Sequence, residues 1–350
     1  MTYIMLALGF ILDLFYKIIG NYGFAIILFT IFIKLALFPL DLKQRRSMAK
    51  TQKLQPLLME VQKKYGNDKE KLNQETMKLY QKYNINPASG CLPMFIQFPI
   101  ILALYWVIRK PIFYMMGVSP EDIWRIAEAF NAWGAANADK VPAGITLPLT
   151  YAKGMGADNS FGMNEITISQ MLYNYPEILN HPAITSWDKV ITPINFSFLG
   201  MDLSETPSLN AFFGMFIGKF SNVTPSVALL WIIPILSGFS SWLASRITNP
   251  SSAEKPKKGV VLSEAEKSQM KTSNSTNDTM RTMTMIMPLF SAWFAFTLPA
   301  AVGLYWTVSN LIQILNHLLV KKYMTETISE EELEGEIQNV KSRKNRKKHK

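Results

Sequence analysis

The chain has 350 residues, 49% of them hydrophobic, and a formal net charge of +10 at pH 7. Its single cysteine, Cys91, excludes an intramolecular disulfide and argues against a cysteine-based metal site. Long apolar runs alternate with strongly basic stretches, which predicts an all-α polytopic membrane protein rather than a soluble domain.

The first 21 residues form an apolar segment that differs from a signal peptide. No basic region precedes Ile4, no small-residue cleavage site follows the segment, and Asp13 and Lys17 interrupt it. We therefore expect residues 1–21 to form an amphipathic helix lying in the outer membrane interface.

Five later runs are long enough to cross a bilayer, which takes about 20 residues per helix. Pro299 separates the last two runs so tightly that they are expected to form an antiparallel helical hairpin. The predicted transmembrane helices span residues 22–42, 88–110, 226–247, 281–298 and 299–321.

The charges of the connecting segments predict on which side of the membrane each segment lies. Residues 43–87 carry eleven Lys or Arg against four acidic residues, Arg246–Arg281 is again basic, and the tail 322–350 ends in KSRKNRKKHK. The segment 111–225 has twice as many acidic as basic residues. Positively charged loops stay in the cytosol, so the N-terminus is predicted outside and the C-terminus inside, with 111–225 as a long outer loop.

Residues 43–87 also show two apolar stripes at helical spacing, separated by Gly66 and Asp68. Glycine ends helices and aspartate caps their starts, so this segment is predicted to be a helical hairpin projecting into the cytosol. It has two interpretations, an ordinary solvated hairpin or a docking arm for an incoming chain.

Lys34 is the only ionisable residue in the first apolar run, Tyr22–Leu40. A lysine at such a depth costs about 3 kcal/mol on insertion scales and usually faces a bundle interior or a wet cavity. Alternatively, its stem could carry the ammonium toward the cytosolic headgroups, or toward Asp41.

Uncharged polar residues occupy the same runs. In the last run Trp306, Asn310, Gln313 and His317 share one helical face. They could form interhelical hydrogen bonds, or they could line a hydrophilic groove with Lys34 at its floor. Because a buried lysine without an intramembrane acid needs water, we favour the groove. Its candidate residues are Lys34, Thr30, Gln97, Trp306, Asn310 and Gln313.

Enzyme motifs are absent from the sequence. The three histidines lie far apart, and no phosphate-binding glycine loop, HExxH or GxSxG occurs. We therefore expect no catalytic residues, no metal and no cofactor. The lack of an intramembrane acid also argues against a proton-coupled transporter.

Four stretches of the sequence together form a specific pattern. They are NPASGCLPMFIQFPI (86–100), PAAVGLYWTVSNLIQ (299–313), the first crossing with its QRRSMAKTQKLQP continuation, and FLGMDLSETPS (198–208). This pattern resembles the YidC-type membrane protein insertases: the first two stretches are similar to the family's second-crossing and last-crossing signatures, and the other two lie around Lys34 and ahead of the third crossing. The missing large outer domain before the first crossing is similar to the Gram-positive branch.

The resemblance implies a bundle of five transmembrane helices around a hydrophilic groove carrying the charge of Lys34. It implies a multi-pass protein of the bacterial plasma membrane that inserts nascent membrane proteins, alone or with a Sec-type translocon. The basic tail and the cytosolic loops would contact the ribosome. Two features depart from the family: arginine is common where Lys34 stands, and the outer loop is unusually long.

Two other functions remain open from sequence alone. Lys34 could serve as counter-ion in a transporter of small solutes or anions. The chain could also be a structural assembly factor without insertion activity.

Overall fold

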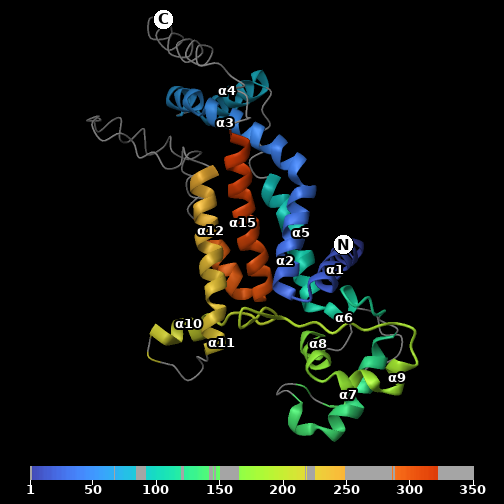
Figure 1. Ribbon diagram of the computed structural model, residues 1–350. Coiled ribbons are helices and arrows are strands. Elements are labelled where there is room, and N and C mark those ends of the chain that lie inside the picture. The colour runs from blue at the N-terminus through green and yellow to red at the C-terminus, as the bar shows by residue number, and fades with distance from the viewer. Residues whose placement is uncertain are drawn as a thin grey trace, which may run out of the picture. The chain divides into compact units, whose positions relative to one another are not determined.

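The computed structural model describes residues 2–66, 68–83, 92–119, 122–141, 165–216, 225–248 and 288–321, with single positions at 145, 147–149, 218 and 286. The described residues are mostly helical, as the all-α class predicts, with one small β-hairpin (Figure 1). They divide into two compact units. Unit one comprises Met1–Phe32, Pro99–Ser237 and Ser291–Ser309, and unit two comprises Ile33–Phe98, Gly238–Phe290 and Asn310–Lys350.

Unit one begins with helix α1 (Thr2–Ile19), which packs against the short helix α6 (Pro111–Tyr114). Gly9 allows this approach, because a Cβ there would collide with the carbonyl of Tyr114. The opposite face of α1 exposes large apolar side chains such as Tyr3 and Phe10. The interfacial position of residues 1–21 stays a prediction.

The predicted outer loop folds locally around a core of its own. Helix α7 (Ile123–Ala136) packs on α9 (Pro182–Thr185) and on the 3₁₀ turn η4 (Pro176–Asn180), burying Ile126, Phe130, Ile178 and Ile184. Helix α8 (Glu165–Asn174) contacts η4 and α6. The segment also contains η2 (Ala138–Lys140) and α10 (Leu209–Phe216).

A β-hairpin lies within the stretch FLGMDLSETPS. Strands β1 (Ser197–Phe198) and β2 (Met201–Asp202) pair antiparallel, and both turn residues, Leu199 and Gly200, have positive φ. Such φ values suit the right-handed twist of a two-residue hairpin. The segment after β2 then caps α15 (Ala300–Lys321), because the first N–H groups of this helix donate to the carbonyls of Leu203 and Glu205 at 2.8 Å.

The helices near the predicted third, fourth and fifth crossings also meet in unit one. Helix α11 (Pro225–Leu230) leads through Trp231 into α12 (Ile232–Thr248). The hydroxyls of Ser237 on α12 and Ser291 on the helical segment 288–297 lie 3.2 Å apart. Gly303 lets α15 approach Ile233, whose Cγ2 would lie 2.6 Å from an added Cβ. Small residues at these contacts are typical of helices that pack in membranes.

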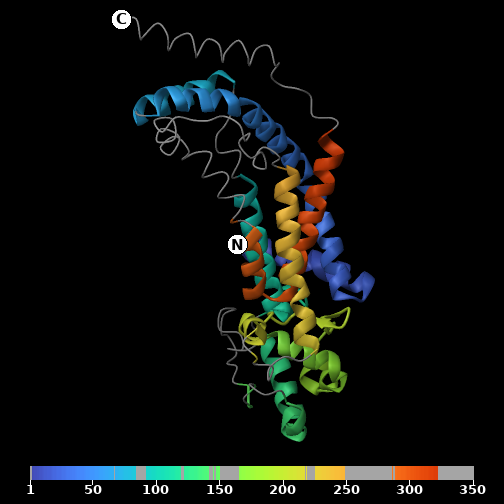
Figure 2. The ribbon, with the colours of Figure 1, turned by 90° about the vertical axis from the view of Figure 1, so that its left-hand side faces the viewer.

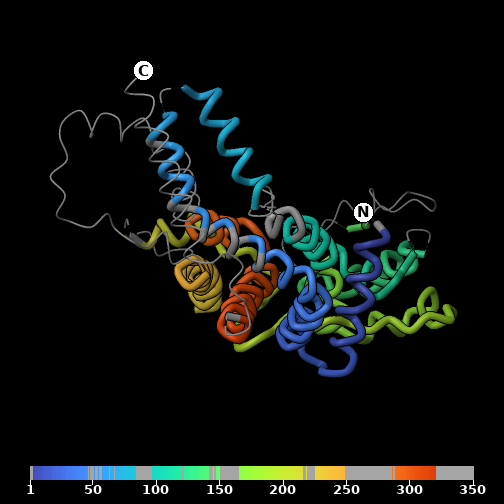
Figure 3. Tube along the Cα trace, turned by 90° about the horizontal axis from the view of Figure 1, so that it is seen from above, coloured from blue at the N-terminus to red at the C-terminus, as the bar shows by residue number. Residues whose placement is uncertain are grey.

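Unit two contains the hairpin predicted within residues 43–87. Helices α3 (Phe38–Tyr65) and α4 (Lys69–Lys82) run side by side, as Figures 2 and 3 show. Leu54, Leu57, Val61 and Leu79 form their shared core. Asp68 caps α4 by accepting a hydrogen bond from the backbone N–H of Lys71 at 3.1 Å. Residues 84–91 lie outside the described residues.

A bend separates α2 (Tyr22–Ala36) from α3. The segments 22–36 and 38–45 meet at 57°, and Leu37 lies between them. Pro39 explains the bend, since it cannot donate the backbone hydrogen bond that a continuous helix requires. The helix predicted for residues 22–42 is therefore broken close to Lys34.

Length and hydropathy identify fewer spans among the described residues than the five predicted. Residues 225–248 form one helix long and apolar enough to cross a membrane, and the bent pair 22–36 and 38–45 gives a second if it counts as one span. The apolar helix 97–109 is shorter. Part of the predicted crossings 88–110 and 281–298 lies outside the described residues, and the structure does not confirm the number five.

Candidate functional site

The candidate site in unit two centres on Lys34, which lies in the last turn of α2 and is partly exposed. Its Nζ donates a hydrogen bond of 3.1 Å to Oε1 of Gln97. Gln97 belongs to α5 (Leu92–Arg109), so this bond joins two of the predicted crossings. The structure thus brings together two candidates that are 63 positions apart in the sequence.

The partner of Lys34 is neutral, and this leaves its charge available. Among the described residues, no carboxylate lies within ion-pair distance of Nζ. An ammonium group has three N–H donors, so the bond to Gln97 leaves two for water or for an acidic group of a ligand. Chemically, the pair can attract and hydrate an anionic or polar segment.

A second cation in unit two is compensated instead. Arg45 is buried, with only 8% of its surface exposed. Its Nε lies 2.7 Å from Oδ2 of Asp41, and its Nη2 donates to the backbone carbonyl of Gln313 at 3.1 Å. Arg45 therefore joins α3 to α15, while the side chain of Gln313 stays partly exposed. The sequence analysis missed Arg45, although its i,i+4 spacing from Asp41 is typical of a helical ion pair.

Two other candidates are occupied by helix contacts. Asn310 is buried on α15, and its amide donates to the hydroxyl of Ser240 on α12 at 3.1 Å. Thr30 is fully buried in unit one, and its hydroxyl donates to the carbonyl of Ile26 one turn earlier at 2.6 Å. These bonds agree with the interhelical interpretation for Asn310 and with local backbone bonding for Thr30.

Trp306, the remaining candidate, lies in unit one. Its ring is partly exposed and meets the ring of Phe294 edge to face, with centroids 5.9 Å apart. Of the six candidates, the structure thus joins Lys34 and Gln97 directly and places Asn310 and Gln313 in contacts of the same unit.

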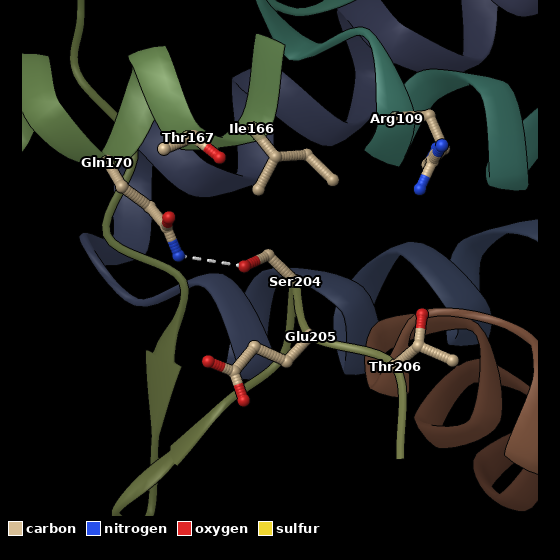
Figure 4. Close-up of a pocket in the computed structure, with 7 residues that line it drawn as sticks. All are labelled: Arg109, Ile166, Thr167, Gln170, Ser204, Glu205 and Thr206. Carbon is tan, nitrogen blue, oxygen red and sulfur yellow. Dashed lines mark hydrogen bonds between the residues drawn. The ribbon is translucent and has the colours of Figure 1, made fainter. Parts of the chain in front are cut away.

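The structure also describes a cavity that the sequence did not indicate. Its volume is about 340 Å³, and six of its seven lining residues carry polar side chains (Figure 4). It belongs to unit one and is formed by other residues than the predicted groove. The lining residues are Arg109, Ile166, Thr167, Gln170, Ser204, Glu205 and Thr206. Among the described residues, no group of His, Cys, Asp and Glu side chains could hold a metal ion.

Comparison with known proteins adds independent information. The family model described as "60Kd inner membrane protein" matches residues 14–327. "Membrane protein insertase YidC" of Nitratidesulfovibrio vulgaris (strain DP4) is 51% identical over 102 residues, which are 29% of this chain and 19% of that protein. The protein of the same name from Fusobacterium nucleatum is 49% identical over 115 residues, 33% of this chain and 53% of that protein.

A third relative of the same name, from Thioalkalivibrio sulfidiphilus, is 40% identical over 124 residues, 35% of this chain and 22% of that protein. The matched parts thus span between about a fifth and about half of these relatives' length. The relatives are named as insertases and not as enzymes, which agrees with the prediction that the chain is not an enzyme.

Proposed function

Because the chain belongs to the 60Kd inner membrane protein family, we propose that it is an insertase that moves nascent proteins into the membrane without covalent chemistry. The family match confirms the resemblance that the four signature stretches indicate. The observation that carries the proposal is the ammonium of Lys34, which has a neutral hydrogen-bond partner, Gln97, and forms no ion pair among the described residues.

The mechanism follows from the free energy of polar groups in hydrocarbon. Each polar group that crosses a bilayer without a hydrogen-bond partner costs several kcal/mol. Lys34 and Gln97 would offer a charge and hydrogen bonds to the short polar tail of a nascent protein, which lowers this cost. The apolar segment of the substrate would then leave sideways into lipid by hydrophobic partitioning.

The other candidates would support this site in different ways. Asn310 would hold α15 against α12 through its buried hydrogen bond to Ser240, whereas the hydroxyl of Thr30 bonds within its own helix, α2. Trp306 and Gln313 are partly exposed and would add polar or aromatic contacts for the substrate. We propose that Lys34, Gln97, Gln313 and Trp306 line a hydrophilic groove in a bundle of five transmembrane helices.

Location and partners form a further part of the proposal. The chain would be a multi-pass protein of the bacterial plasma membrane, with its N-terminus outside and its C-terminus in the cytosol. The α3–α4 hairpin, which presents many cations, would receive the nascent chain. The basic tail 322–350, outside the described residues, would contact the ribosome. The protein would act alone or with a Sec-type translocon.

A photo-crosslinking experiment tests the groove. A crosslinking amino acid at Gln97 should form adducts with a single-span substrate during its synthesis. Leu35 provides a matched control, because it is adjacent to Lys34 and 67% exposed, but faces another side of α2. Adducts at Leu35 and none at Gln97 would sink the groove model.

Substitution of Lys34 then separates charge from polarity. Lys34→Arg keeps the charge and should preserve insertion, whereas Lys34→Gln should impair insertion, most for substrates with acidic outer tails. Protease protection of the tail in reconstituted vesicles measures this. Equal insertion by all three proteins, combined with saturable solute uptake by the wild type only, would favour the transporter alternative.

A further inference from the structure

The cavity of unit one lies where three segments meet. Arg109 is the last residue of α5, Thr167 and Gln170 lie on α8, and Ser204 to Thr206 follow β2. Its volume of about 340 Å³ is close to the lower end of the range for small-molecule sites. The cavity can therefore hold one small polar group rather than a folded partner.

One wall of the cavity is preorganised by hydrogen bonds. The amide of Gln170 donates to the hydroxyl of Ser204 at 2.9 Å, as Figure 4 shows, and also to Oδ2 of Asp202. Asp202 in turn accepts from the backbone N–H of Ser204 at 2.9 Å. The carboxylate of Asp202 thus accepts hydrogen bonds from residues of the wall itself, so the charged groups available to a ligand belong to other residues of the cavity.

Two opposite charges line the cavity without pairing. The guanidinium of Arg109 points into the space in Figure 4, and its described side-chain contact is the ring of Tyr105, with the centroid 5.8 Å away. The carboxylate of Glu205 is turned away from it. Among the described residues, neither group forms an ion pair. An unpaired cation and an unpaired anion in one cavity match a ligand that carries both charges.

The position of Arg109 indicates which ligand this is. The helix 97–109 is apolar, and its end presents Tyr105 and Trp106 together with two cations. Lys110 lies over the ring of Trp106 at 5.6 Å, as Arg109 does over Tyr105. Aromatic and cationic residues at the end of an apolar helix are typical of the membrane–water interface. In the topology proposed above, this end lies at the level of the outer lipid headgroups.

We propose that the cavity binds the zwitterionic headgroup of an amine-bearing glycerophospholipid. Arg109 binds the phosphate, with the Thr206 hydroxyl as a further donor, and Glu205 accepts from the ammonium group. A guanidinium presents paired N–H donors that match phosphate oxygens. We favour the headgroup over a nascent polypeptide tail as the ligand. The cavity has one cation and one anion at fixed positions, which match the constant charges of a headgroup, whereas the charges of nascent tails vary with their sequence.

Occupancy of the cavity would also stabilise the outer end of unit one. The carbonyls of Leu203 and Glu205 accept the first N–H groups of α15, so a ligand held by Ser204–Thr206 fixes the segment that caps this helix. A bound headgroup would thereby order the start of a helix on which the proposed groove depends.

Binding of short-chain lipids to the purified full chain in a neutral detergent tests the proposal. The probes are dihexanoyl phosphatidylethanolamine, dihexanoyl phosphatidylglycerol and inorganic phosphate, with native mass spectrometry and the shift in unfolding temperature as readouts. We expect the ethanolamine lipid to bind most tightly. Arg109→Gln should weaken both lipids about tenfold or more, because a charge-assisted contact is lost. Glu205→Gln should abolish the preference for the amine.

Lys110→Gln is the matched control, because Lys110 is adjacent to Arg109 and does not line the cavity. It should leave lipid binding unchanged, and circular dichroism should show that all three variants are folded. Unchanged binding by Arg109→Gln would overturn the proposal. So would inorganic phosphate binding as tightly as the lipid, or displacement of the lipid by a peptide copy of an acidic substrate tail. Binding is measured without insertion, so this test can fail while the proposed function holds.

Discussion

The hydrogen bond between Asn310 and Ser240 offers a test of how the polar residues of the last helix are used. If the bond holds helices together, its removal should destabilise the fold. If Asn310 instead serves a hydrated groove, the loss should affect substrate contacts with little change in stability. The substitutions are Asn310→Ala, Ser240→Ala and the double variant.

The expected size of the effect follows from burial. Asn310 is 8% and Ser240 is 3% exposed, so water cannot replace the lost partner. A hydrogen bond of this kind contributes about 1 kcal/mol, and leaving a buried group unsatisfied costs roughly 1–3 kcal/mol. Each single variant should therefore lose about 1–2 kcal/mol. Between membrane helices the coupling of two such residues averages about 0.6 and reaches about 1.7 kcal/mol.

The assay is reversible unfolding in mixed micelles, with the coupling taken from the double-mutant cycle. The cycle is needed because Ser240 has a further interaction, so the single variant Ser240→Ala does not isolate the bond to Asn310. Ser241→Ala is the matched control, since this neighbouring serine is 8% exposed and forms no described hydrogen bond with Asn310. Its cycle with Asn310→Ala should be additive within about 0.5 kcal/mol.

Two results would refute this reasoning. Additive effects of Asn310→Ala and Ser240→Ala would mean that the bond contributes nothing to the fold. A strong loss of nascent-chain adducts at Gln97 in Asn310→Ala, with unchanged stability, would place Asn310 in the substrate path and restore the groove interpretation for this residue.

Two further predictions concern unit one. Gly9→Ala should lower the unfolding temperature, because the new Cβ meets the backbone of Tyr114. In the control Gly134→Ala the new Cβ meets the flexible end of a leucine side chain at 2.5 Å, so this variant should have an unchanged or higher unfolding temperature. Equal changes in the two variants would contradict the packing of α1 on α6. Burial, and then the charge of Asp202, raises the pKa of Glu205. The stability contributed by the protonated carboxyl is present below the unfolded pKa, about 4.3, and is lost as the pH rises through the folded pKa. Glu205→Gln should therefore raise the unfolding temperature, measured without lipid, at neutral pH but not in mild acid; the same gain at both pH values would contradict the raised pKa.

Local sequence patterns were sufficient for the helical hairpin of unit two. The stripes containing Leu54, Leu57 and Leu79 have helical spacing, and Asp68 has the capping role that its position predicts. Such signals depend on neighbours three or four residues away, so they can be recognised in one sequence. The bend at Leu37 depends on local sequence too, and Pro39 could have indicated it.

Contacts between distant segments could not be predicted in the same way. The pairing of Lys34 with Gln97 was expected only as a shared environment, and the contact of Arg45 with the Gln313 carbonyl was not expected at all. The cavity beside Arg109 combines residues from three parts of the chain. No periodicity links such positions, because their proximity results from tertiary packing.

A comparison of Lys34 with Arg45 in unit two shows why the charge at position 34 can remain available. Arg45 forms an ion pair with Asp41 and donates to a helix carbonyl, so its charge is neutralised within the protein and its function is structural. Lys34 has the same charge but a neutral amide as partner. An acid in place of Gln97 would hold the ammonium more firmly and would also cancel its attraction for a passing chain. A glutamine fixes the position of the ammonium without that loss, and the compact lysine, with three donors, keeps two for the substrate.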